Sequence, residues 1–408
     1  MVYPRVSLYA LMLASAGIPL YIHLPHFASS ELGIGLGAIA TILIAIRFVD
    51  LVQDPLIGWA IDRWPQAQSL FAGLAAGGLA VGFPLLFSLN EGTYVLAKMV
   101  AALVLLFSAY SMGMILLYGC SATLASEPTP RALMTLAGFR EAGMLVGVVL
   151  AAIAPLILAK LTGTSNAYPA FGWFLGAIAL VCAWVARPIW NRPIVPGKRF
   201  SVASLRKGTS LHLLLVALVN SLPVAITSTL FLFFVEDRLE LDGMAGLLLL
   251  LFFLSAGLSV PFWAKLSQHF SPRTILLIAM PLAIFGFAGA AFLVPGQAIP
   301  FALICVASGA ALGADMVILP AMFSVALTQA QSEASLAFGI WSFAGKLGLA
   351  LAALLVLPIL EGSGFKPTAQ NSDAALSMLS TLYTIVPCLL KLCALALVFA
   401  LPSKDITP

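Results

Sequence analysis

Three ionisable residues lie inside a long apolar run at 42–59, and their spacing points to a specific chemistry. Arg47, Asp50 and Asp54 stand at i, i+3 and i+7, so a helix places all three on one face. At the centre of a bilayer each such group costs at least about 2.5–3.5 kcal/mol. Three of them on one face therefore predict a polar path or an ion site inside a bundle of membrane helices.

The two carboxylates indicate a cation. Asp50 and Asp54 are one helical turn apart, and neighbouring carboxylates resist ionising together. A bound Na⁺ or a proton relieves that repulsion, because Arg47 can neutralise only one of them. Pro55 lacks an N–H, so the Leu51 carbonyl loses its helical donor and becomes a further candidate ligand. The alternative is structural: Arg47 pairs with Asp50 to fix helix packing, and Asp54 caps a kink beside Pro55.

Composition places this run in a membrane. The chain is 62% apolar and only 9% charged, with a mean hydropathy of +1.07, whereas soluble domains carry about 25% charged residues. Apolar stretches long enough to span a bilayer recur along nearly the whole chain. They predict an all-α membrane protein with transmembrane helices at 7–28, 37–60, 69–89, 93–118, 131–160, 167–186, 211–235, 242–263, 274–294, 298–324, 334–360 and 376–402.

The basic residues of the predicted loops indicate the orientation. With the N-terminus inside, the loops and adjoining span ends on the opposite side hold only four of them, Lys98, Lys160, Arg238 and Lys366. This positive-inside bias predicts that both termini are cytoplasmic, in the inner (plasma) membrane of a bacterium. The bias also accounts for the excess of positive charge. Membrane lipid is therefore the expected surrounding, and a nucleic-acid partner is not expected.

The chain divides once, at a basic and proline-containing stretch. That stretch, 187–210, is the predicted cytoplasmic linker between an N-terminal bundle at 1–186 and a C-terminal bundle at 211–408, with six spans each. A faint repeat relates the halves: Ala-Gly-Met-Leu at 142–145 matches Ala-Gly-Lys-Leu at 344–347. Two six-helix bundles joined in this way predict the major facilitator fold, the architecture of a secondary transporter that works by alternating access.

The eight charges that lie deepest in the predicted spans are balanced, with four basic and four acidic residues, which favours mutual pairing in a water-accessible interior. They are Arg47, Arg140, Lys346, Lys391, Asp50, Asp54, Glu141 and Asp315. Arg140 and Glu141 are sequence neighbours about 100° apart around a helix, so each is expected to find its partner on another helix.

The other three buried charges lie in the C-terminal half. Lys346 stands among small residues that let another helix approach closely, and we expect it to face the two aspartates across the halves. Lys391 is expected to be a structural or snorkelling lysine. Asp315 is expected to anchor one helix to another.

The motif at 47–59, followed by Asp62 and Arg63, resembles the second-helix signature of the glycoside–pentoside–hexuronide:cation symporter family. Further similarities lie at 223–237, 313–320 and 338–347, so the resemblance spans most of the chain. It implies the major facilitator fold and cation-coupled alternating access. Asp50 and Asp54 match the family's cation-site aspartates, and Lys346 matches the eleventh-helix lysine placed near that site.

The sequence also departs from the family pattern. Ala14 stands where the family's sugar-binding aspartate lies on the first helix, and no acidic residue lies between Glu91 and Glu127 on the fourth. The basic tail after the second helix is shortened to 62–66. Because sugar hydroxyls need acceptors in a buried site, these departures argue against a galactoside. An arginine and a lysine in the spans suit an anionic solute, such as a uronide or a phosphorylated or sulfonated compound.

We therefore expect a monomeric secondary transporter that couples Na⁺ or H⁺ to symport of a small polar solute, sugar-like or anionic. The cation-coupling residues are expected to be Asp50, Asp54, Arg47 and Lys346. The candidates for solute binding are Tyr21, Arg140, Glu141, Asn220 and Trp341, the last as a stacking platform. The sequence shows no catalytic triad or phosphate-binding loop that would indicate an enzyme. The alternatives are a cation-coupled carrier of a lysolipid or other amphiphile, and a non-transporting receptor of the same fold.

Overall fold

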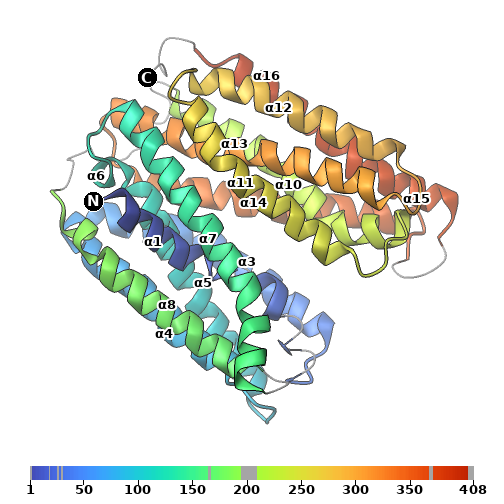
Figure 1. Ribbon diagram of the computed structural model, residues 1–408, viewed down its shortest axis with the longest axis horizontal. Coiled ribbons are helices and arrows are strands. Elements are labelled where there is room, and N and C mark those ends of the chain that lie inside the picture. The colour runs from blue at the N-terminus through green and yellow to red at the C-terminus, as the bar shows by residue number, and fades with distance from the viewer. Residues whose placement is uncertain are drawn as a thin grey trace. The chain divides into compact units, whose positions relative to one another are not determined.

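The chain folds into long helices (Figure 1). The computed structural model describes residues 2–17, 19–24, 27–28, 31–163, 167–193, 209–366 and 371–402. Within them, ten helices are long and apolar enough to cross a membrane: Pro65–Phe87, Val95–Gly119, Pro130–Thr162, Tyr168–Asn191, Ser210–Arg238, Ala245–Leu266, Pro272–Phe292, Ala298–Gln329, Ser335–Gly362 and Asp373–Phe399. Each coincides with one predicted span from the third to the twelfth.

The described parts of the first two predicted spans are also largely helical. The first contains α1 (Tyr3–Ala14) and a π-helical turn, η1 (Pro19–His23). The second is α3 (Leu36–Arg63), with Pro55 in its interior. The all-helical membrane fold is therefore confirmed, with ten of the twelve predicted spans long and apolar enough to cross a membrane. Most of the predicted linker, 194–208, lies outside the described residues.

The chain divides into two compact units. The first comprises Met1–Pro128, Gly138–Phe200 and Gln331–Phe343, and the second comprises Thr129–Ala137, Ser201–Ala330 and Ala344–Pro408. Two helices, α7 (Pro130–Thr162) and α14 (Ser335–Gly362), are thus shared between units near their N-terminal ends. The shared segments start 202 residues apart, at 129 and 331, which is the offset of the sequence repeat.

In the first unit, α4 (Gln68–Phe87) packs against α5 (Val95–Gly119) and α8 (Tyr168–Ala186) (Figure 1). Glycines one turn apart let α8 approach α4. A Cβ atom on Gly172 would lie 2.7 Å from the Phe83 carbonyl oxygen, and one on Gly176 would lie 2.7 Å from that of Ala80. Small residues at i and i+4 are a common means of close packing between membrane helices.

The second unit uses the same device. α11 (Ala245–Leu266) packs against α13 (Ala298–Gln329), and α12 (Pro272–Ala288) packs against α13 and α16 (Val386–Phe399). Gly309 and Gly313 of α13 lie against the α11 backbone, where a Cβ atom would clash with carbonyl oxygens. α10 (Ser210–Phe233) completes this group by packing on α16.

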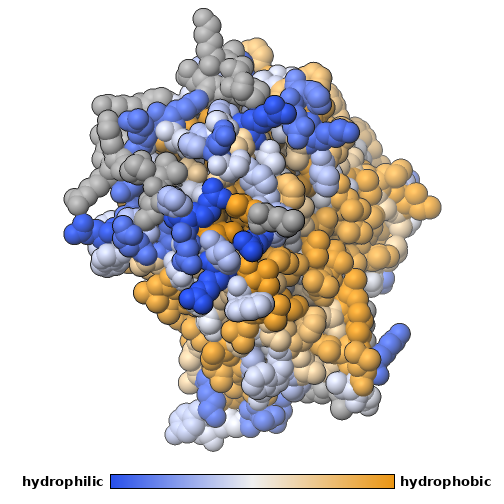
Figure 2. Space-filling model, turned by 60° about the vertical axis from the view of Figure 1, so that its left-hand side comes forward, coloured by the Kyte–Doolittle hydropathy of each residue, from blue (hydrophilic) through white to orange (hydrophobic). Residues whose placement is uncertain are grey.

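Large apolar side chains face outward over much of the molecule. Figure 2 shows a broad apolar surface, with hydrophilic residues gathered toward the top and the bottom of that view. Phe285, Trp184 and Ile299 are each about three-quarters exposed. A soluble monomer rarely exposes apolar patches on this scale, whereas a bilayer requires them.

Candidate functional site

The α3 helix buries charged residues and exposes apolar ones, which is the reverse of a helix in a soluble protein. Asp50 and Asp54 are 0% exposed, whereas Phe48 and Val52 on other sides of the same helix are 61% and 65% exposed. Lipid can accept the apolar face, and the charged face can be stabilised only by other side chains or by water. The predicted charged face is therefore the face that packs inside the first unit.

Asp50 is held by two donors from its own helix. Arg47 Nη1 lies 3.0 Å from one carboxylate oxygen, and Gln53 Nε2 donates to the other at 2.8 Å. Ser108 of α5 in turn donates to Gln53 Oε1 at 2.8 Å. The Arg47 guanidinium also lies 5.0 Å from the centre of the Phe107 ring on α5. The predicted pairing of Arg47 with Asp50 is thus present, and α5 fixes its geometry.

Asp54 connects α3 to the N-terminal turns of α14. The Ser342 hydroxyl donates to Asp54 Oδ2 at 2.5 Å. The two backbones come close at the same level, because a Cβ atom on Gly339 would lie 2.6 Å from the Asp54 carbonyl oxygen. The charge on Asp54 is therefore in direct contact with α14. This contact could not be read from the sequence, in which the two residues are 288 positions apart.

One further contact joins α3 to α14, at the end of α3 beyond the predicted span. Asp62 accepts hydrogen bonds from the backbone N–H groups of Ser335 (3.0 Å) and Leu336 (2.7 Å). These N–H groups have no partner within the first turn of α14. The Asp62 carboxylate thus caps a helix from a distant part of the chain and complements the positive end of its dipole.

Gly58 makes this contact possible. A Cβ atom at Gly58 would overlap the Ser335 carbonyl oxygen and lie 2.8 Å from Leu336 Cα. We expect Gly58→Ala to destabilise the protein by about 1–3 kcal/mol, because backbone must move to admit the methyl group. Gly345→Ala on α14 is the matched control, since no atom lies within 4 Å of a Cβ there and alanine is the better helix former. Thermal unfolding in detergent measures both, and equal stabilities for the two variants would contradict this account.

The Asp62 cap predicts a pH dependence of stability. Burial raises the pKa of Asp62 from 3.8 to about 6, although the N–H groups of Leu336 and Ser335 act in the opposite direction. Between about pH 4 and 6 the folded state then binds more protons than the unfolded state, so the free energy of unfolding falls as pH rises through that window. Asp62→Asn is expected to remove this component from unfolding measured between pH 4 and 7. A parallel pH profile for wild type and variant would refute it.

A second charged group lies between α5 and α7. Arg140 Nε lies 3.0 Å from Glu141 Oε1, and both side chains are almost fully buried. Tyr118 of α5 donates to the same Glu141 oxygen at 3.0 Å, and its ring centre lies 3.6 Å from the Arg140 guanidinium carbon. Each residue thus has a partner on another helix, as expected, but the expectation that these neighbours cannot face the same spot is wrong. Their long side chains close the 100° gap, and Tyr118 serves both.

The N-terminal turns of α14 reach this group as well. The ring centres of Phe338 and Tyr118 are 5.5 Å apart, and those of Trp341 and Phe338 are 6.1 Å apart. Phe338, Trp341 and Ser342 follow at i, i+3 and i+4, so one helical face carries the aromatic contacts and the hydrogen bond to Asp54. Three predicted site residues, Arg140, Glu141 and Trp341, are thereby joined through aromatic residues that the sequence reading did not single out.

The Arg140–Glu141 pair retains unused hydrogen-bonding capacity. Arg140 Nη2 and Glu141 Oε2 are buried and have no hydrogen-bond partner within the described part of the chain. A buried polar atom without a partner is costly, so this position favours a polar ligand or water. It offers one donor and one acceptor side by side.

Three further residues are predicted site residues, namely Tyr21, Lys346 and Asn220. Tyr21 belongs to η1, and its role stays a prediction. Lys346 lies in the portion of α14 that belongs to the second unit, so its proximity to the aspartates also stays a prediction. The close helix approach expected beside Lys346 is present at Gly348, where a Cβ atom would lie 2.5 Å from the Ser221 hydroxyl of α10.

Asn220 belongs to a separate polar cluster inside the second unit. Lys391 of α16 donates to Asn220 Oδ1 at 2.6 Å and pairs with Asp315 of α13. Asn220 also donates to Asp315 at 3.1 Å. Asp315 is thus the interhelical anchor that the sequence predicted. Lys391 does not snorkel, because its ammonium group is buried in this cluster.

The described residues gather no group of three or more His, Cys, Asp or Glu side chains that could hold a metal ion. A cation at Asp50 and Asp54 therefore needs further oxygen ligands from hydroxyl or carbonyl groups. Ser342 Oγ is one such oxygen, since it already lies against Asp54. This environment suits a weakly bound alkali cation or a proton.

The comparison with protein families decides the identity of the chain. The sequence model of a family described as MFS/sugar transport protein matches residues 6–405. The chain belongs to this family. The similarity recognised at 47–63 is thereby confirmed over nearly the whole length. No curated protein matches the chain.

Three solved structures with this fold are transporters. The E. coli fucose:proton symporter FucP is 13% identical with a TM-score of 0.65, covering 96% of this chain and 98% of its own. A bacterial homologue of the iron transporter ferroportin is 14% identical with a TM-score of 0.69, covering 98% of each. The human organic anion transporter MFSD10 is 15% identical with a TM-score of 0.62, covering 96% and 98%. Identities this low show the fold alone. Family and fold together establish a non-enzymatic secondary transporter of a small-molecule solute, embedded in a membrane.

Proposed function

We propose that the protein is a symporter that couples Na⁺ or H⁺, bound at Asp50 and Asp54, to the transport of a small polar solute, sugar-like or anionic. One observation carries the proposal. The segment 335–343 of α14 contacts Asp54 through Ser342 and contacts the Arg140–Glu141–Tyr118 group through Phe338. A single helical segment therefore links the candidate cation site to the candidate solute site.

The two aspartates have different environments, which suggests different roles. Asp50 is neutralised by Arg47 and fixed by Gln53. Asp54 contacts α14 through a neutral hydroxyl. A cation or proton at Asp54 changes the charge that Ser342 faces, and that change acts directly on the helix that carries Trp341. In the proposed cycle the cation displaces the pairing of these carboxylates with Lys346 or Arg47, and the solute then binds before the two halves reorient.

The unused atoms of the Arg140–Glu141 pair support the proposed solute class. The free Arg140 nitrogen can donate to a hydroxyl or carboxylate oxygen, and the free Glu141 oxygen can accept from a hydroxyl. A hydroxylated solute supplies both groups at once. The aromatic rings of Phe338 and Trp341 add apolar area for the less polar face of a sugar-like ring.

Thermal unfolding of the purified protein in detergent tests the proposal. Sugars, uronides and lysolipids are compared with Na⁺, with Li⁺ and with neither, at two pH values. A ligand at 100 times its Kd stabilises the folded state by about 2.7 kcal/mol. We expect a sugar or uronide to raise the unfolding temperature, and the rise to depend on Na⁺ or pH. Stabilisation by lysolipids alone, independent of cation, would favour the amphiphile carrier and reject this proposal.

A further inference from the structure

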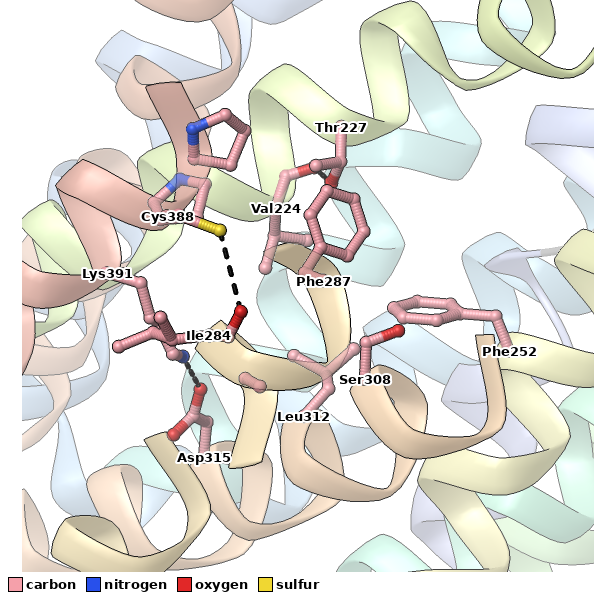
Figure 3. Close-up of a pocket in the computed structure, with 13 residues that line it drawn as sticks. Val224, Thr227, Phe252, Ile284, Phe287, Ser308, Leu312, Asp315, Cys388 and Lys391 are labelled. Carbon is pink, nitrogen blue, oxygen red and sulfur yellow. Dashed lines mark hydrogen bonds and ion pairs between the residues drawn. The ribbon is translucent and has the colours of Figure 1, made fainter. Parts of the chain in front are cut away.

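A pocket opens inside the second unit (Figure 3). Residues of α10, α11, α12, α13 and α16 line it, and most of them are apolar, including Val224, Phe252, Phe287 and Leu312. The centre of a water molecule can occupy about 60 Å³ of it. That space exceeds what one water needs, so the pocket admits several waters or a small organic ligand.

One wall of the pocket carries the buried ion pair. Asp315 and Lys391 both line it, and Figure 3 shows their side chains meeting at its edge. The pair is electrically neutral, because one ammonium faces one carboxylate. Lys391 has three N–H donors, and Asn220 and Asp315 accept two of them. The second carboxylate oxygen of Asp315 is buried without a hydrogen-bond partner within the described residues.

The other polar side chains of the pocket already donate their hydrogens to backbone carbonyl oxygens. Thr227 donates to the Val224 carbonyl at 3.1 Å, and Ser308 donates to the Ile304 carbonyl at 2.6 Å. The Cys388 thiol faces the Ile284 carbonyl oxygen of α12 (Figure 3), and the sulfur and oxygen atoms are 3.7 Å apart. What remains for a ligand is therefore mostly acceptor oxygen atoms, together with one lysine N–H.

We infer that this pocket binds a small neutral alcohol or phenol, through its apolar body and its single hydroxyl. A hydroxyl can donate to one of the acceptor oxygens and accept from Lys391, so it matches the hydrogen-bonding groups of the pocket that are still available. A charged ligand is disfavoured, because it would upset the neutral ion pair in an apolar setting. A purely apolar ligand would leave the Asp315 oxygen and the third Lys391 N–H without a hydrogen-bond partner. The inference is independent of the proposed symport, since the residues that line the pocket include none of those assigned to cation or solute.

The thiol of Cys388 provides a direct test without any transport assay. Cys388 lines the pocket and is partly buried, whereas Cys393 on the same helix is exposed. The wild-type protein in detergent is treated with methyl methanethiosulfonate, and the modification rate of each cysteine is followed by peptide mass mapping. Phenol and toluene are the probes, because they have the same size and differ in the hydroxyl. Cys393 is the control in the same molecule.

We expect phenol to slow the modification of Cys388 in a saturable way and to act at about tenfold lower concentration than toluene, as a hydrogen bond to a charged group predicts. Cys393 should react at an unchanged rate. In Leu312→Trp, and in the milder Val224→Phe, the larger ring fills the pocket, so the effect of phenol on Cys388 should be lost. The inference is overturned if Cys388 is unreactive without a probe, if phenol does not protect it, or if toluene protects it equally well.

Discussion

Asp54→Asn is expected to abolish the cation dependence of both solute binding and transport. The amide is nearly isosteric with the carboxylate and keeps an oxygen that can accept from Ser342, so the fold should persist. It carries no charge, and it can neither attract Na⁺ nor release a proton. Accumulation of solute against its gradient should therefore fall at least about tenfold, which corresponds to the loss of about 1.4 kcal/mol of coupling free energy.

The measurement is solute-induced thermal stabilisation with and without Na⁺ at two pH values, beside uptake into vesicles. If H⁺ is the coupling ion, Asp54→Asn resembles the protonated state, and solute should bind at both pH values alike. If Na⁺ is the coupling ion, Na⁺ should no longer affect the unfolding temperature. A cation-dependent shift equal to that of the wild type would exclude Asp54 as the coupling residue.

Asp50→Asn is the matched control, and it should fail in a different way. It removes the partner of Arg47 and leaves that guanidinium without its carboxylate at 3.0 Å. Losing one member of a buried pair costs about 3–5 kcal/mol, a figure that partial exposure of Arg47 reduces. The expected result is a large drop in unfolding temperature in every buffer together with weaker cation dependence, whereas Asp54→Asn loses the cation dependence without that drop.

The parts of the site that the sequence predicts are those encoded within one helix. The charged face of α3 follows from residue spacing alone, because a helix fixes which residues share a face. The Arg47–Asp50 pair is a local i, i+3 contact. The succession of spans also follows from local composition, since a bilayer demands long apolar runs wherever the chain crosses it.

Contacts between helices could not be predicted, because they depend on how each helix is rotated against its neighbours. The Asp62 cap joins residues 273 positions apart, and a lone aspartate at a helix end carries no sign of its partner. Tyr118 reads as an ordinary aromatic residue of a membrane helix, yet it bonds Glu141. Asn220 was expected at the solute site on polarity alone, whereas the structure commits both ends of its amide to Asp315 and Lys391.

Arg140→Met should destabilise the protein by about 3–5 kcal/mol, because it leaves Glu141 buried without its cation. Glu141→Gln should have a comparable effect for the opposite reason, since Arg140 then lacks its carboxylate. Both groups are almost fully buried, so solvent cannot screen the charge that is left. Thermal unfolding in detergent measures each loss, and an unchanged unfolding temperature in both variants would contradict the ion pair.

The double variant Arg140→Met/Glu141→Gln separates stability from function. It leaves no unpaired charge, and the oxygen of the introduced amide can still accept from the Tyr118 hydroxyl, so most of the lost stability should return. Residues in direct contact show interaction energies of about 0.5–3 kcal/mol in such a cycle. Solute binding should not return, because the donor nitrogen of Arg140 and the charged acceptor of Glu141 are both gone. A double variant that is stable and binds solute like the wild type would assign this pair to the architecture of the first unit and remove it from the solute site.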